Sequence, residues 1–384
     1  MSPYDVYEMF RGTLDTMGFM SMSWQLPVMW CIAGAFLYLA IVKGFEPLLL
    51  LPIGFGIFMV NFPMVPLMGY NESTGYPELI RAFYHYGLEW EIIPCVIFLG
   101  LGALTDFGPL IANPKTLLVG AGAQLGVFVT FTGCVLAGFT LKEAASVSII
   151  GGADGPTTIY LTQALAPQLL GANALAAYSY MSMVPLIQPP FMRMMTTDAE
   201  RKIPMRQLRA VSKTEKILYP LVSTLVISLL VPAVSPLMSM FMLGNLMKES
   251  GVVGRLVETS GGALMNIVTI FLGVSVGCTM QAEKFLTAKP LFIVSLGLID
   301  FAVCTMGGVA TVKLMNLFLK EKMNPLIGSA GVSAVPMAAR VSHNVGQQYD
   351  KKNYLLMHAM GPNLAGLMGT AAAAGMFIAM FGRA

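Results

Sequence analysis

The string GGADGPTTIY, residues 151–160, sets one acidic residue among glycines inside an apolar stretch of the chain. A carboxylate at bilayer depth costs about 3 kcal/mol or more unless it is paired or faces water, so Asp154 is a candidate functional residue. Asp154 can also cap a half-helix that has Pro156 in its first turn. The two roles are compatible, because a capped helix break is also where a cation meets a carboxylate and free carbonyl groups. Thr157 and Thr158 add hydroxyl oxygens, which suit a hard cation such as sodium.

The composition around this string is that of an integral membrane protein. Of the 384 residues, 56% are hydrophobic and only 11% are charged, and the mean hydropathy is +0.70. Its 39 glycines and 23 prolines fit transmembrane helices, where neighbouring helices satisfy the backbone groups that these residues free. The net charge of +3 is too small to indicate nucleic-acid binding. The five cysteines stand apart in apolar stretches, so the sequence predicts no transition-metal site. The only metal predicted is sodium, from the oxygen donors around Asp154.

Apolar runs predict an all-α polytopic fold. Nothing in the chain alternates with a period of two, which argues against a β-barrel. Residues 1–24 are expected to form an amphipathic segment on the membrane surface, and they lack the features of a cleavable signal peptide. Runs long enough to cross a bilayer lie at 25–42, 46–64, 113–138, 217–236, 290–318 and 354–382. Shorter or glycine-interrupted runs lie at 89–103, 143–168, 173–191, 237–255, 262–279 and 324–341.

Two of the broken runs correspond to one another. Ile150-Gly151-Gly152-Ala153 matches Ile327-Gly328-Ser329-Ala330 at an offset of 177 residues, and the same offset places Met183-x-Pro185 on Met360-x-Pro362. Upstream, Leu101-Gly102-x-Leu104 resembles Leu243-Gly244-x-Leu246 at an offset of 142 residues. Broken hydrophobic segments in corresponding positions are typical of transporters. The sequence therefore predicts two membrane repeats, residues 25–210 with a hairpin at about 143–168 and residues 211–384 with a hairpin at about 324–341.

The distribution of basic residues indicates that the repeats are inverted. The surroundings of the first hairpin, 139–142 and 165–176, contain only Lys142. By the positive-inside rule the second hairpin then opens to the cytoplasm and the first to the outside. The basic loop at 193–216 lies in the cytoplasm between the two halves. The basic residues near the second hairpin are Lys320, Lys322, Arg340, Lys351 and Lys352.

The second hairpin, NPLIGSAGVSAVP at residues 324–336, contains no carboxylate. Two hairpins that meet at mid-membrane would combine one negative charge with several neutral oxygens. Such a site suits a monovalent cation and disfavours strong divalent binding. Two tyrosines, Tyr178 and Tyr180, precede Met183, and each is either functional or an interfacial aromatic residue. The second hairpin offers the side chains of Asn324, Ser329 and Ser333 and exposed backbone at Gly328 and Gly331.

Five ordered strings resemble a known family, the beta subunits of the sodium-pumping biotin-dependent decarboxylases. They are GGADGPTTIY, YSYMSMVPLIQPP, LMKESGVVGRL, NPLIGSAGVSAVPMAARVS and LLMHAMGPNLAG. Family members act on oxaloacetate, methylmalonyl-CoA, glutaconyl-CoA or malonate. The resemblance implies that the chain decarboxylates carboxybiotin, consumes a proton and exports sodium across the cytoplasmic membrane. It also implies a scaffold with a mobile, elevator-like ion-binding core.

The resemblance also implies partners and site residues. The partners are a carboxyltransferase subunit, a biotin carrier subunit and a small single-span membrane subunit, in a hetero-oligomer. Biotin must arrive on another chain, because the nearest Met-Lys pair reads LMKES and no AMKM sequence is present. The implied catalytic residues are Asp154 and Tyr180, with Tyr180 as a proton donor or relay. The implied sodium ligands are Asp154, Asn324, Gly328, Ser333 and Asn363.

A second class of function has the same inverted-repeat plan, that of a secondary sodium/carboxylate symporter. The decarboxylase hypothesis demands soluble partner subunits and release of carbon dioxide, whereas a symporter takes up a solute alone. The substrate of the complex is not encoded here, because carboxyl transfer to biotin would occur on another subunit. The length of the chain favours the CoA-thioester members over the oxaloacetate branch.

Overall fold

The computed structural model describes residues 11, 13–14, 17–65, 67–71 and 74–382. Within these ranges every regular element is a helix, and strand pairing is limited to an isolated bridge between Tyr70 and Pro77. The predicted amphipathic segment at 1–24 lies mostly outside the described residues, and its described part includes a short 3₁₀ turn, η1 (Gly18–Ser21). The chain divides into two compact units, Met1–Trp90 with Thr269–Leu291, and Glu91–Val268 with Phe292–Ala384. The predicted boundary near residue 210 stays a prediction.

The first unit is held together by close backbone contacts between helices. A Cβ added at Gly277 would lie 2.3 Å from the carbonyl oxygen of Ile53, and one at Gly56 would lie 2.6 Å from that of Val274. Small residues allow such approach in membrane helices. The elements of this unit are α2 (Gln25–Ile41), α3 (Pro47–Val60), α4 (Leu79–Phe83), the π-helix η2 (Tyr84–Glu89), the end of α16 (Met265–Cys278) and α17 (Ala282–Phe285).

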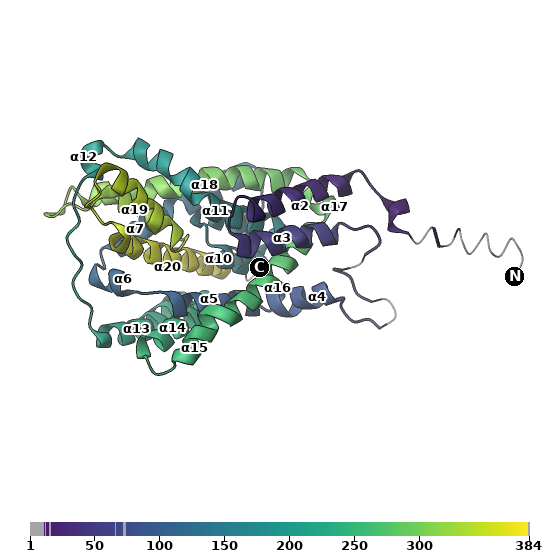
Figure 1. The fold of residues 1–384 in the computed structure, drawn as a ribbon, viewed down its shortest axis with the longest axis horizontal. Coiled ribbons are helices and arrows are strands. Elements are labelled where there is room, and N and C mark those ends of the chain that lie inside the picture. The colour runs from purple at the N-terminus through teal and green to yellow at the C-terminus, as the bar shows by residue number, and fades with distance from the viewer. Residues whose placement is uncertain (1–10, 12, 15–16, 66, 72–73, 383–384) are drawn as a thin grey trace, which may run out of the picture. The chain divides into compact units, whose positions relative to one another are not determined.

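The second unit contains the remaining elements and both predicted hairpins (Figure 1). Its earlier elements are α5 (Ile92–Leu104), α6 (Gly108–Ala112), α7 (Thr116–Ala123), α8 (Leu125–Leu136), α9 (Leu141–Ser148), η3 (Ile149–Gly152), α10 (Gly155–Leu165), η4 (Pro167–Leu169), α11 (Leu170–Met195) and α12 (Asp198–Arg201). Its later elements are α13 (Lys213–Leu230), η5 (Pro232–Val234), α14 (Ser235–Ser250), α15 (Gly254–Thr259), η6 (Ser260–Leu264), most of α18 (Ala288–Met315), η7 (Pro325–Gly331), α19 (Met337–Tyr349) and α20 (Leu356–Phe381).

These helices confirm the prediction of an all-α polytopic membrane protein. Among the described residues, four helical stretches are long and apolar enough to cross a bilayer. The consecutive stretches Leu79–Glu89 and Ile92–Leu104 could supply a fifth span. Other predicted elements are shorter or are broken, as between η3 and α10. The four stretches are Thr116–Leu136, Gly254–Cys278, Ala288–Phe318 and Leu356–Phe381.

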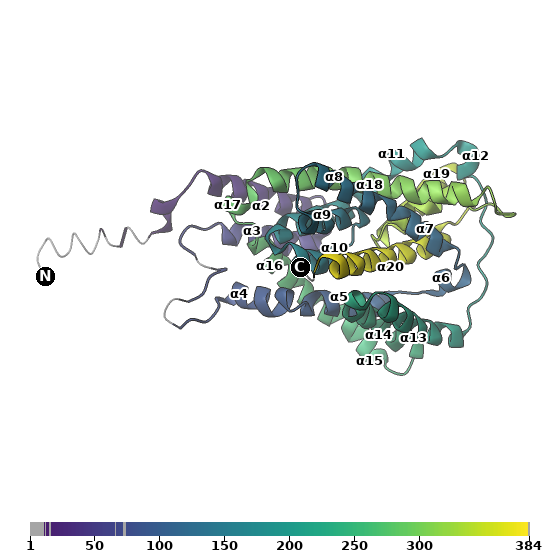
Figure 2. The same ribbon diagram turned by 180° about the vertical axis from the view of Figure 1, so that it is seen from behind.

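Helices α5 and α14 of the second unit lie side by side, and two glycines set their separation (Figures 1 and 2). A Cβ added at Gly102 would lie 1.9 Å from the Phe241 carbonyl oxygen. One added at Gly244 would lie 2.1 Å from the Leu99 carbonyl oxygen. These are the two glycines that the sequence comparison matched at an offset of 142 residues. Such reciprocal contact is expected of two related helices around a local two-fold axis, and it is compatible with the predicted repeats.

Both predicted hairpins contain a break and precede a long helix with an internal proline. In the first, η3 and α10 are separated at Ala153, which has a left-handed φ of 50°. In the second, η7 ends at Gly331 and α19 begins at Met337. The helices that follow, α11 and α20, have 26 residues each and contain the matched prolines Pro185 and Pro362. Helix α20 contacts α7, α10, α19 and η7 within its unit.

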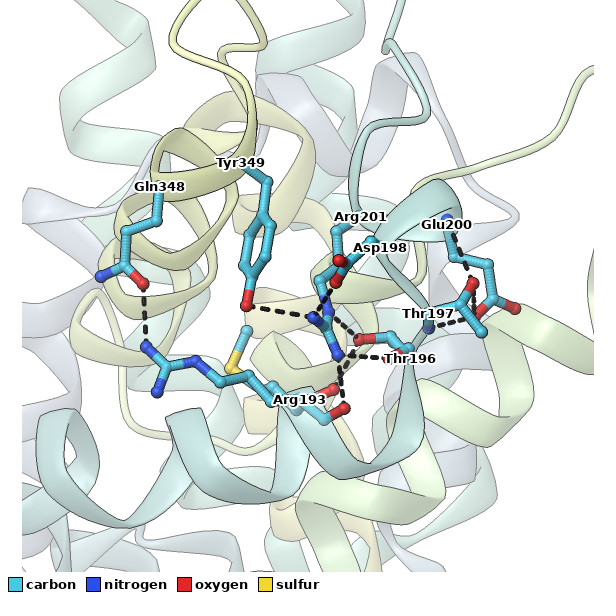
Figure 3. Close-up of polar contacts among 9 residues, drawn as sticks. Arg193, Thr196, Thr197, Asp198, Glu200, Arg201, Gln348 and Tyr349 are labelled. Atoms are coloured by element: carbon cyan, nitrogen blue, oxygen red, sulfur yellow. Dashed lines mark hydrogen bonds and ion pairs between the residues drawn. The ribbon is translucent and has the colours of Figure 1, made fainter.

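Arg201 connects the loop at 193–216 to Tyr349 at the end of α19 (Figure 3), and its backbone bonds Asn324 in the second hairpin. Its side chain is buried, and its guanidinium donates to the Thr196 hydroxyl at 2.9 Å and the Tyr349 hydroxyl at 3.0 Å. The guanidinium also pairs with the Asp198 carboxylate at 2.5 Å. The carbonyl oxygen of Arg201 accepts a hydrogen bond from the Asn324 amide at 2.8 Å. The guanidinium of Arg201 therefore joins α11, α12 and α19, and its backbone carbonyl adds the start of η7.

The close approach of α5 and α14 predicts the effect of a single methyl group. Gly102→Ala would force that methyl against the Phe241 carbonyl, and we expect a loss of about 1–3 kcal/mol in unfolding free energy. Chemical denaturation in detergent micelles measures it. Gly262→Ala is the matched control, since nothing lies within 4 Å of its Cβ position, and helix propensity predicts a neutral change or a gain of up to about 1 kcal/mol. Equal stability of the two variants would contradict the contact.

Candidate functional site

Asp154 lies at the N-terminus of α10, where its buried carboxylate caps the helix. Its side chain is 4% exposed. One carboxylate oxygen accepts from the Thr157 hydroxyl at 2.6 Å, and the other accepts from the Thr157 backbone N–H at 3.3 Å. The Thr158 hydroxyl donates to the Asp154 carbonyl at 2.7 Å. The left-handed residue Ala153 turns the chain into this cap. The predicted cap is therefore present, and the carboxylate that forms it lies inside the protein.

The break of the second hairpin meets the break of the first directly. The backbone N–H of Ser333 donates to the Gly152 carbonyl at 2.7 Å, two residues before Asp154. The Ser333 hydroxyl hydrogen-bonds the Thr370 hydroxyl, which itself donates to the Gln124 side-chain carbonyl at 3.3 Å. Since Thr370 has one proton to give, Ser333 is the donor in their bond. The lone pairs of the Ser333 oxygen thus remain available to a cation.

Asn363, on α20, supplies a second oxygen beside the same break. Its amide nitrogen donates to the carbonyls of Ala330 at 3.1 Å and Val332 at 2.7 Å, which fixes the orientation of the amide. The side chain is 0% exposed, and its carbonyl oxygen has no hydrogen-bond partner among the described residues. A buried carbonyl oxygen without a partner costs free energy, and a sodium ion is a suitable partner for it.

Asn324 and Gly328 lie in the same hairpin, but no described hydrogen bond joins them to Asp154. Asn324 caps η7 by accepting from the Leu326 N–H at 3.0 Å, and its amide donates to Arg201 and Ile203 carbonyls. Gly328 permits close packing, because a Cβ there would lie 2.4 Å from the carbonyl oxygen of Gly308 on α18. Both residues thus shape the hairpin in the structure. Their predicted part in sodium binding stays a prediction.

Tyr180 faces α18, and a different tyrosine packs beside Asp154. The Tyr180 hydroxyl donates to the Val294 carbonyl, and its ring covers Gly297. A Cβ added at Gly155, the residue after Asp154, would lie 2.0 Å from the Tyr178 ring. The sequence singled out both tyrosines but could not tell which packs on the first turn of α10.

A second buried carboxylate, that of Asp300, was missed by the sequence analysis. It is 0% exposed, and its Oδ2 accepts from the backbone N–H of Gly151 at 2.8 Å. A Cβ on Gly151 would lie 2.0 Å from the Asp300 carboxyl carbon, so only glycine fits there. No described basic residue forms an ion pair with Asp300. The signal was available, since Asp300 is the single acid in the predicted apolar run at 290–318. Thr370 and Gln124 were also missed.

Comparison with known proteins places the chain in a family. Residues 25–381 match the model of the Na⁺-transporting oxaloacetate decarboxylase beta subunit. The chain is 58% identical to the glutaconyl-CoA decarboxylase subunit beta of Acidaminococcus fermentans, covering 97% of each chain. It is 52% identical to the methylmalonyl-CoA decarboxylase subunit beta of Propionigenium modestum, over 97% of this chain and all of the relative. It is 50% identical to the oxaloacetate decarboxylase beta chain of Klebsiella pneumoniae, over 97% and 98%.

These matches extend over nearly the whole chain and nearly the whole of each relative, at identities far above those at which family membership is in doubt. They confirm the resemblance that the five strings indicated. The protein belongs to the family of beta subunits of the sodium-transporting, biotin-dependent decarboxylases.

Proposed function

We propose that this chain decarboxylates carboxybiotin carried by a partner subunit and couples that reaction to sodium export through the site where the two hairpins meet. The observation that carries the proposal is the contact between Gly152 and Ser333, where two helix breaks meet beside a buried carboxylate and the Asn363 oxygen, which has no partner among the described residues. Family membership supports the same function and disfavours the symporter alternative.

The proposed sodium site combines one charged and several neutral oxygens. Asp154 supplies the carboxylate, while Ser333 and Asn363 supply a hydroxyl and an amide carbonyl. The remaining proposed ligands, Asn324 and Gly328, come from the same hairpin, the first through its amide oxygen and the second through its backbone. One negative charge in a buried site attracts a monovalent cation without holding it irreversibly.

Decarboxylation requires a proton and no redox partner. The bond between the ureido nitrogen and the carboxylate carbon breaks, its electron pair stays on nitrogen, and carbon dioxide leaves. A proton then completes the nitrogen. An acid that alternates between a sodium-bound and a protonated form links the two events, because sodium and a proton compete for the same carboxylate. In this proposal Asp154 is that acid and Tyr180 relays the proton.

The proposed setting is a hetero-oligomer in the cytoplasmic membrane. A carboxyltransferase subunit loads biotin, a carrier subunit delivers it, and a small single-span subunit completes the membrane part. The second hairpin opens to the cytoplasm as part of a mobile, elevator-like core in two inverted repeats. Basic residues at the second hairpin and in the loop at 193–216 support this orientation.

The substrate class of the complex is proposed to be a CoA thioester. The match to the glutaconyl-CoA relative extends over 371 residues, whereas the match to the Klebsiella oxaloacetate relative needs 426 aligned positions to cover a similar share of this chain. Assaying the complex with glutaconyl-CoA, methylmalonyl-CoA and oxaloacetate distinguishes the classes.

One experiment tests the function itself. The purified complex is reconstituted into vesicles and supplied with free carboxybiotin, with and without sodium, while carbon dioxide release and sodium uptake are followed together. Sodium-dependent release with parallel uptake is expected. Uptake of a carboxylate solute without carbon dioxide release would favour a symporter.

Asp154→Asn tests the charge of the proposed ligand. Asparagine caps helices as well as aspartate does, so α10 should keep its structure. We expect carbon dioxide release and sodium uptake both to fall below about a tenth of wild type, because losing the charge should cost more than about 1.4 kcal/mol. Glu283→Gln, which neutralises an exposed carboxylate in α17, serves as control and should retain full activity. Coupled turnover above that level, in a correctly assembled variant, would exclude Asp154 as the essential acid.

Ser333→Ala tests one neutral ligand. Removing one of several oxygens should raise the half-saturating sodium concentration about tenfold and leave the maximal rate intact. Ser342→Ala is the matched control, because Ser342 is equally buried but hydrogen-bonds Ser329 and the Ala338 carbonyl, away from the break. Rates that drop by the same factor at every sodium concentration would assign Ser333 a structural role instead.

Tyr180→Phe tests the proton relay, since it removes only the hydroxyl that donates to Val294. We expect a maximal rate reduced at least about tenfold, with half-saturating sodium unchanged. Tyr160→Phe is the control, because Tyr160 is equally buried and likewise donates to a backbone carbonyl, that of Ala233 at 2.9 Å. If the two variants turn over alike, Tyr180 is a packing residue.

A further inference from the structure

An extended segment at 203–211, between α12 and α13, lies over two cavities that the sodium site does not use. The segment has no helical structure. One cavity has a volume of about 610 Å³ and the other about 600 Å³. Both are lined by Met205 and Arg209 of the segment and by His358 of α20. Their size lies within the range of roughly 300–1,000 Å³ that holds small-molecule ligands.

The first cavity has an excess of positive charge. Arg209, Lys216 and Lys352 line it, against the single carboxylate of Asp106. Arg209 is paired with Glu215 at 2.7 Å, and Lys216 is paired with Asp106 at 2.9 Å. Burial opposes ionisation of Asp106, but the Gly108 N–H and the Lys216 ammonium outweigh it and lower the pKa of that carboxyl group. No described carboxylate forms an ion pair with the exposed ammonium of Lys352, so this charge is available to an anion.

His358 forms the inner wall shared by both cavities. It is 7% exposed, and its Nδ1 has no hydrogen-bond partner among the described residues. A buried imidazole nitrogen without a partner is costly, and a bound ligand in the cavity would satisfy it. The exposed ring of Tyr354 also lines the first cavity and offers a flat apolar surface. The cavity thus combines the ammonium of Lys352, the buried Nδ1 of His358 and the aromatic ring of Tyr354.

The position of His358 connects the cavity to the proposed sodium site. His358 and Asn363 are five residues apart on α20, which corresponds to about 7.5 Å along the helix axis. A ligand that contacts His358 would therefore sit about one and a half helical turns from the oxygen of Asn363.

We propose that the first cavity binds the carboxylated ureido ring of carboxybiotin, with its carboxylate against Lys352 and Arg209 and a ring polar group at His358. This inference rests on the proposed function and assigns the place where the substrate head group is held. The neutral bicyclic ring fits the apolar wall, and the carboxylate fits the excess of positive charge.

The test uses the purified complex in vesicles and free carboxybiotin as the probe. Lys352→Gln should raise the KM for carboxybiotin at least about fivefold, with half-saturating sodium unchanged. Lys351→Gln is the matched control, because Lys351 is an equally exposed neighbour that does not line either cavity. It should keep the wild-type KM. His358→Gln should raise the KM for carboxybiotin as well, again without a change in half-saturating sodium.

The outcomes separate the inference from the function on which it rests. If Lys352→Gln and Lys351→Gln both keep the wild-type KM while wild type shows sodium-dependent decarboxylation, the cavity assignment is wrong and the proposed function stands. If wild type itself releases no carbon dioxide from free carboxybiotin, the proposed function fails and the cavity assignment fails with it. Because Lys352 is exposed, its substitution should not prevent folding.

Discussion

The hydrogen bond from the Ser333 N–H to the Gly152 carbonyl is the interaction on which the site depends. A helix break inside a bilayer leaves backbone groups without helical partners, and each unsatisfied group costs several kcal/mol. Here each hairpin supplies a partner for the other, so neither break is satisfied alone. Glycine at residue 152 leaves room for this contact, because a Cβ there would lie 2.8 Å from the Thr370 hydroxyl and would displace it. Asp154 follows two residues later, and its position is therefore set by both hairpins.

The first break, residues 151–154, is also held by a second carboxylate, that of Asp300. Asp300 on α18 accepts the Gly151 N–H, so the segment 151–154 contacts one buried acid at its first residue and contains another, Asp154, at its last. No basic residue among those described pairs with either acid. A buried negative charge without a counter-charge is unfavourable, and either a cation or a proton relieves it. In the proposed mechanism, sodium and a proton would each neutralise this buried charge, and that is the reason they would exchange there.

The all-helical membrane fold could be predicted from the sequence, because apolar length is a local signal. Apolar length identifies α2, α3, α18 and α20, and glycines beside Asp154 identify the first break. Hydrogen-bond partners that come from distant segments could not be predicted. Nothing local in the sequence says that Gln124 and Thr370 orient the Ser333 hydroxyl, or that Tyr180 faces α18. The backbone partners of the Asn324 side chain, at Arg201, Ile203 and Leu326, likewise have no signal in the local sequence, and its predicted part in sodium binding stays a prediction.

Helix α20 extends from the cavity at His358 to the proposed sodium site at Asn363. His358, Asn363 and Thr370 lie along this one helix, at the cavity, at the second hairpin and at the first break respectively. Pro362 lies between the first two and removes a backbone hydrogen bond, which makes this the point where a helix bends most readily. A ligand that contacts His358 would therefore touch the turn of α20 that contains Pro362. The next residue, Asn363, holds the carbonyls of Ala330 and Val332 in the second hairpin. The cavity and the proposed sodium site are thus joined by one continuous helix, although they do not share a residue.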